Sequence, residues 1–126
     1  MVRLMTISEL DSVLKLVKEQ DLNTLREALP HLNVYVYEEE GHIKGFTYIL
    51  DGYCIGDLIV EDASLKGSIE QELLEVLKSK YDELLINISE DDSYLKAILE
   101  SSSFAFEETY LDESSGETLH SYAFYS

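Results

Sequence analysis

Near the start of the chain, apolar residues recur at helical spacing. Between residues 10 and 17 they fall three and four positions apart, which predicts an amphipathic helix. Thr6 and Glu9 precede it with the spacing of a capping box, which pairs backbone N–H groups of a first turn. A second short helix is expected over 22–29, because a proline follows at position 30. A short strand at 2–5 comes before both helices.

Strand patterns then follow one another closely. They occupy 33–38, 42–50 and 53–60, with Gly41 in the first connection and an Asp-Gly turn signal in the second. Gly41 can take the positive φ that a tight turn needs. These short connections predict a three-stranded antiparallel meander.

The second half of the chain alternates between helical and extended patterns. A helix begins near Ser68, where Gln71 completes a second capping box, and residues 84–88 form the apolar run of a buried central strand. The remaining elements are a helix capped by Asp91-Asp92-Ser93 and a hairpin of 104–111 with 118–125. Strand, helix and strand over 58–88 predict a right-handed crossover between parallel neighbours. We therefore expect one domain, 1–126, with an α/β fold: a mixed, mostly antiparallel sheet and about four helices.

The charge of the chain is extreme, with 26 acidic and 9 basic residues and a net charge of −17. Nucleic acids and anionic membranes are not expected partners, because both require a basic surface. Such a field attracts cations, so a cationic small molecule or a basic peptide is the expected partner, although solubility alone is the simpler interpretation. A single cysteine, Cys54, and the lack of a signal-peptide pattern or long apolar run favour a cytoplasmic protein.

The segment 58–74 carries the clearest indication of a site. The apolar strand Leu58-Ile59-Val60 leads through a polar turn into the helix at Ser68. A helix start leaves backbone N–H groups unpaired, and these suit a phosphate. Glu70, however, places a carboxylate in the first turn, where it opposes an anionic ligand.

Asp57 interrupts the same apolar strand just before Leu58. With a raised pKa it would act as a general base. The alternatives are a solvated edge residue or a partner for Lys44. The histidines lack the spacing of metal ligands, so no metal is expected.

The whole chain resembles a short bacterial member of the GNAT superfamily of N-acetyltransferases. The resemblance rests on the order of elements, on Arg3-Leu4-Met5-Thr6 in the first strand, on 34–46, and on Leu58-Ile59-Val60 ahead of 84–88. It implies the GNAT fold, in which the parallel strands splay apart, and transfer of an acetyl group from acetyl-CoA to an amine. The implied cofactor-binding residues are Leu58, Ile59, Val60, Lys66, Gly67, Ser68, Ile69 and Glu70.

Two motifs depart from the family pattern. Where the pyrophosphate loop reads Arg/Gln-x-x-Gly-x-Gly/Ala, this chain has Leu65, Ser68 and Glu70. Where a tyrosine often protonates the leaving thiolate, it has Leu99, and Tyr94 is expected on another face of that helix. An active acetyltransferase and a degenerate binding or regulatory module therefore both stay open. A weaker third hypothesis is an acidic decoy for a nucleic-acid-binding protein.

Overall fold

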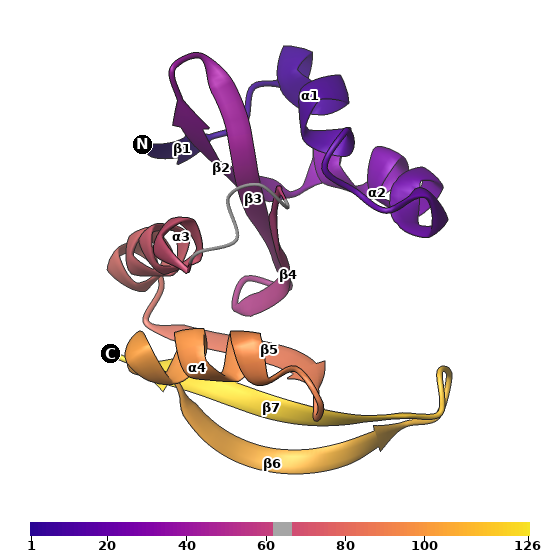
Figure 1. Cartoon of the computed structure of the whole chain (residues 1–126), viewed down its shortest axis with the longest axis vertical. Helices are drawn as coiled ribbons and strands as arrows, with labels where there is room; N and C mark the ends of the chain where they lie inside the picture. Colours follow the sequence, from indigo (N-terminus) through magenta and orange to yellow (C-terminus); the bar gives the residue numbers. More distant parts are fainter. Residues whose placement is uncertain (62–66) are drawn as a thin grey trace.

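Seven strands form one sheet in the order β1-β2-β3-β4-β5-β7-β6 in the computed structural model, which describes residues 1–61 and 67–126 (Figure 1). The strands are β1 (Val2–Leu4), β2 (Asn33–Glu39), β3 (His42–Leu50), β4 (Cys54–Val60), β5 (Glu83–Ser89), β6 (Ala105–Asp112) and β7 (Glu117–Tyr125). The helices are α1 (Leu10–Leu14), α2 (Leu22–Ala28), α3 (Ser68–Lys80) and α4 (Ser93–Ser101), with short 3-10 segments η1 (Ile7–Glu9), η2 (Glu19–Asp21) and η3 (Leu29–His31). This mixed α/β arrangement confirms the predicted fold class. No helix in the described ranges is long and apolar enough to cross a membrane.

Of the two capping boxes predicted at helix starts, the first is confirmed and the second is wrong. The Thr6 backbone N–H donates to Oε1 of Glu9 at 2.9 Å, as the first capping box requires. The second capping box is wrong: Gly67, not Ser68, is the N-cap of α3, with φ of 88° in the left-handed region. Only glycine takes this conformation easily, so the backbone rather than a side chain shapes the entry to α3.

The sheet is continuous only over a short stretch between its two halves. β4 pairs with β5 in parallel at Cys54–Leu85 and Ile55–Ile86, which confirms that the two strands are parallel neighbours, as predicted. Beyond Ile55 no further pair joins the two strands, so they splay apart over 56–60. The free edge of β4 therefore faces open space rather than a neighbouring strand.

A bulge in β4 lies where the splay begins. Tyr48 of β3 pairs with Asp57, and Ile49 pairs with Ile55, so Gly56 has no partner in the β3–β4 ladder. A Cβ on Gly56 would lie 2.0 Å from the Tyr48 ring, so only glycine fits under that ring. The extra residue shifts the alternation of side chains and sets the direction of Asp57.

Two cores cover opposite faces of the first four strands, as Figure 1 shows for α3 on one side and α1 with α2 on the other. One core joins α3 and α4 to the sheet and includes Leu58, Val60 and Leu73. The other lies under α1 and α2 and includes Val13 and Phe46, with Ile59 packed against it. Because residues alternate along β4, Asp57 shares the α1–α2 face with Ile59.

Candidate functional site

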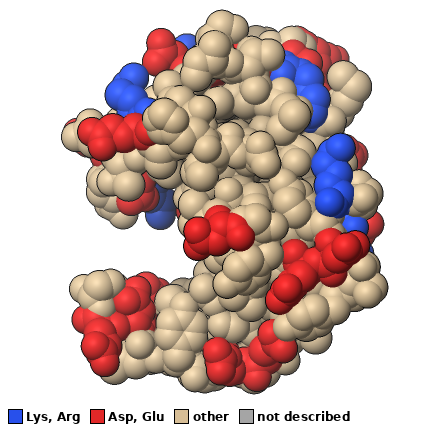
Figure 2. All heavy atoms as spheres, turned by 180° about the vertical axis from the view of Figure 1, so that it is seen from behind, with Lys and Arg blue, Asp and Glu red and all other residues tan. Residues whose placement is uncertain are grey.

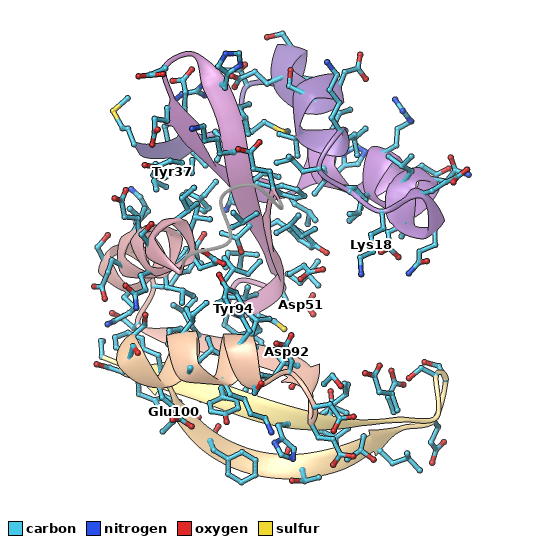
Figure 3. The ribbon with its side chains drawn as sticks, in the orientation of Figure 1. Lys18, Tyr37, Asp51, Asp92, Tyr94 and Glu100 are labelled. Carbon is cyan, nitrogen blue, oxygen red and sulfur yellow. The ribbon has the colours of Figure 1, made fainter. Side chains whose placement is uncertain are left out.

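A cleft of about 550 Å³ lies at the splayed edge of β4. Its apolar lining residues are Leu16, Val17, Leu58, Ile59, Val60 and Leu95, and its polar lining residues are Lys18, Gln20, Asp21, Asp57, Glu70, Asp92 and Tyr94. The lining therefore comes from both faces of the sheet and from the start of α4. Figure 3 shows Tyr94 and Asp92 over α4, near the turn between β3 and β4 that carries Asp51, with Lys18 across the gap near α2.

The polar lining is strongly acidic. Among the described lining residues, four are carboxylates, Asp21, Asp57, Glu70 and Asp92, and one is a cation, Lys18. A cleft with walls of low polarizability focuses the field of its charges, so this one favours a cation and disfavours an anion.

Asp57 is the predicted candidate for a base, and it does line the cleft. Its Oδ1 accepts a 2.8 Å hydrogen bond from the Leu58 backbone N–H, while Thr47 Oγ1 donates to its carbonyl at 2.6 Å. The side chain is open to the cleft, yet the surrounding walls desolvate it and thereby raise the pKa of Asp57. Lys44 pairs instead with Glu39 at 3.1 Å, so the alternative of an Asp57–Lys44 pair is wrong.

Glu70 occupies the first turn of α3, and its side chain is 1% exposed. The Tyr94 hydroxyl donates to its Oε2 at 2.6 Å. Its other oxygen, Oε1, is buried and has no hydrogen-bond partner in the part of the chain that the structure describes. A buried carboxylate oxygen without a donor is costly, because burial removes its hydration and nothing replaces it.

Tyr94 is the residue that sequence reasoning left out of the site. It lies in the first turn of α4, and Asp92 caps this helix by accepting the Leu95 N–H at 3.0 Å. Burial, with the hydrogen bond to Glu70 next in importance, raises the pKa of Tyr94 to about 12, so its hydroxyl stays protonated and remains a donor. Leu99, at the position where the family often has tyrosine, is fully buried in the core.

The predicted cofactor-binding residues divide into three groups. Leu58, Ile59, Val60 and Glu70 meet in the cleft. Ile69 is buried in the core, and neither Gly67 nor Ser68 lines the cleft. Lys66 lies outside the described residues, as does Leu65 at the Arg/Gln position of the family loop. Lys18, Asp21 and Asp92 also line the cleft, although the sequence marks Asp92 only as part of a helix cap and carries no local motif at Lys18 or Asp21.

The described residues do not fit acetyl-CoA well. Two carboxylates stand at or beside the cofactor-binding residues that the resemblance implied. Asp57 Oδ1 already accepts the Leu58 N–H, and Glu70 lies in the first turn of α3. Coenzyme A is itself polyanionic, so both groups would repel it. The buried Oε1 of Glu70 requires a donor, which a phosphate cannot provide.

Solved structures of known proteins match the chain over nearly its whole length. A GNAT-family acetyltransferase from Bacillus cereus ATCC 10987 has a TM-score of 0.87 and 13% identity, covering 100% of this chain and 96% of that one. An IAA acetyltransferase from Bacillus cereus ATCC 14579 has a TM-score of 0.83 and 12% identity, covering 100% and 99%. YncA from Salmonella typhimurium, solved with its cofactor acetyl-CoA, has a TM-score of 0.73 and 14% identity, covering 99% and 92%.

These likenesses show that the chain has the GNAT fold, as the sequence resemblance implied. No protein-family model matches the sequence, and no curated protein is similar to it.

Proposed function

We propose that this GNAT-fold chain binds a cationic amine in the cleft at the splayed edge of β4. The observation that carries the proposal is the set of four carboxylates on the cleft wall, including the buried Glu70. An ammonium group offers three donors, and each charge-assisted hydrogen bond to a carboxylate contributes about 1.5–3 kcal/mol.

The surroundings of the cleft favour the same ligand. Figure 2 shows a hollow between the body of the molecule and the arm formed by β6 and β7, with acidic side chains and no visible basic ones on this arm. Residues 97–126 contain no Lys or Arg at all. An acidic entrance attracts cations over a range of about 10 Å at moderate salt. The cleft volume of about 550 Å³ suits a small molecule better than a folded partner.

Calorimetric titration with three ligands of one chain length tests this proposal. We expect n-hexylamine to bind, and to bind less tightly as salt is raised, whereas hexanol and hexanoate should show no binding. Tighter binding of hexanoate than of hexylamine would overturn the proposal, because it would mean that the cleft accepts anions. A basic peptide that binds where hexylamine does not would identify a protein partner instead.

N-Acetyltransferase activity is the second candidate, favoured by the whole-chain likeness to GNAT acetyltransferases, one of them solved with acetyl-CoA. In this candidate function Asp57 accepts the proton of the amine. Its raised pKa and its place in the cleft both suit this role. Acetyl-CoA should then raise the melting temperature by mass action, and free thiol should form only when an amine is present. An unchanged melting temperature at millimolar acetyl-CoA would exclude this candidate and leave amine binding intact.

A further inference from the structure

The two carboxylates with the most unusual surroundings, Asp57 and Glu70, lie on opposite faces of β4. Asp57 shares the α1–α2 face with Ile59, whereas Glu70 comes from α3, on the face of Leu58 and Val60. Both line the same cleft, which therefore passes around the free edge of the strand. A ligand in this cleft meets one carboxylate at each end.

The two ends lie several residues apart along β4. The side chains of Val60 and Ile69 lie close together, because each would be 3.1 Å from a Cβ added to Gly45. Glu70 follows Ile69 in the chain, so it lies near the Val60 end of β4. Asp57 precedes Val60 by three positions, which is about 10 Å along an extended strand. This separation suits a short chain with a charged group at each end.

Glu70 has one oxygen already held and one still requiring a donor. The Tyr94 hydroxyl donates to Oε2 at 2.6 Å. Glu70 lines the cleft, and its Oε1 is buried without a hydrogen-bond partner among the residues that the structure describes. An ammonium group is the small donor that also neutralises the charge of the carboxylate. The need for a donor therefore points to a ligand rather than to a structural role alone.

We propose that the ligand is a diamine. Its first ammonium group binds at Asp57, and its second binds at the Glu70 carboxylate that the Tyr94 hydroxyl holds in place. The proposal rests on the amine binding proposed above and does not require acetyl transfer. It assigns a cation to the end of the cleft where the resemblance implied the anionic part of acetyl-CoA. The diamine and the cofactor therefore exclude each other at this end.

Comparison of hexamethylenediamine with n-hexylamine tests the proposal, because the two differ by one terminal ammonium group. We expect the diamine to bind the full chain at least about tenfold more tightly in calorimetric titration, the equivalent of one charge-assisted hydrogen bond. Glu70→Gln keeps the shape of the side chain and should weaken the diamine far more than hexylamine, so that the ratio of the two affinities falls towards one. Glu72→Gln, at an exposed position of the same helix with the same change in net charge, should keep the advantage.

The outcomes separate this inference from the proposed function. If neither amine binds, amine binding itself fails, and the diamine proposal fails with it. If both amines bind the wild-type protein equally, only the diamine proposal fails. If Glu70→Gln weakens both amines equally while circular dichroism shows a folded protein, Glu70 does not contact the second ammonium group, and the proposal is overturned. If Glu72→Gln loses the advantage as well, net charge rather than a Glu70 site explains it.

Discussion

The Tyr94 hydroxyl donates to Oε2 of Glu70 at 2.6 Å, and this bond ties the first turn of α4 to the first turn of α3. The two helices follow the two strands that splay apart, so the bond closes one end of the gap that the sheet leaves open. It also holds in place a carboxylate whose other oxygen has no described partner. The Tyr94–Glu70 pair therefore stabilises the fold and positions the carboxylate that we propose binds the ligand.

Tyr94→Phe should lower the free energy of unfolding by about 1–3 kcal/mol, because it leaves the buried Glu70 carboxylate without its donor. Urea denaturation followed by circular dichroism measures the change. Tyr53→Phe is a matched control, since Tyr53 and Tyr94 are both 41% exposed and Tyr53 makes no such bond to a buried acid. Equal effects of the two variants would show that the Tyr94–Glu70 bond contributes nothing to stability.

Asp57→Asn should weaken hexylamine binding by tenfold or more and flatten its dependence on pH. Only the ionised carboxylate attracts the ammonium group, and desolvation raises the pKa of Asp57. As the pH is lowered, wild-type affinity should therefore begin to fall at a higher pH than the ordinary Asp pKa of about 3.9 would give. Calorimetric titrations across this range measure the effect, and an affinity that declines in parallel in both proteins would contradict it.

Gly56→Ala should destabilise the protein by about 1–3 kcal/mol, because the new methyl group meets the Tyr48 ring. The same change should weaken amine binding, since the bulge at Gly56 sets the direction of Asp57. Adding Tyr48→Ala removes the obstacle, so the double variant should lose less stability than the sum of the single losses. Strict additivity in urea denaturation would show that the ring is not what excludes the methyl group.

Glu9→Gln should lower stability at neutral pH by about 1 kcal/mol, because Glu9 forms a two-bonded pair with Arg3 at 2.8 and 2.6 Å. The hydrogen bonds from Arg3 lower the pKa of Glu9 from 4.5 to about 2. The folded state thus binds fewer protons than the unfolded state between these values, so the stabilisation is complete above pH 4.5 and is lost as the pH falls towards 2.

Unfolding free energies of Glu9→Gln and wild type should therefore converge below about pH 3. Glu75→Gln is the control. Glu75 pairs with Lys78, but the Glu75 side chain is 61% exposed, so loss of this ion pair should change the free energy of unfolding little at any pH. A constant gap between Glu9→Gln and wild type down to pH 2 would contradict the assignment.

Glu70→Gly should improve binding of acetyl-CoA if the carboxylate is the main obstacle at the start of α3. The variant removes the charge and the bulk that oppose a phosphate. A shift in melting temperature with acetyl-CoA that appears in Glu70→Gly but not in wild type would bear this out. Glu72→Gly introduces the same glycine into the same helix and should show no such shift. No gain in Glu70→Gly would mean that the entry to α3 has lost its affinity for other reasons.

The order of elements could be predicted from the sequence because each element carries its own periodicity. The apolar run of 84–88 and the alternation over 33–60 reproduce β5 and the meander of β2 to β4. The first helix is shorter than expected: α1 ends at Leu14, and Val17 is bonded to it in a tighter turn. Spacing alone does not distinguish a helix from a helical turn that follows it.

The chemistry of the cleft could be predicted only in part. Asp57 was recognisable because it interrupts an apolar strand, and Glu70 because it places a carboxylate where the family loop has Gly or Ala. Tyr94, by contrast, reaches Glu70 across 24 positions in the chain, and this contact depends on how α3 packs against α4. Asp21 and Asp92 look like ordinary polar residues until folding brings them to the same wall.

The hydrogen bond from the Leu58 N–H to Asp57 has a consequence for the design of ligands for the cleft. A compound that offers only a carbonyl to the Leu58 N–H must displace a carboxylate and leave it without a donor, so the exchange gains little. A primary amide placed there can accept from the Leu58 N–H through its oxygen and donate to the Asp57 carboxylate through its NH2 group. Chemical libraries against this edge should therefore be weighted towards paired donors and acceptors rather than towards thioester mimics.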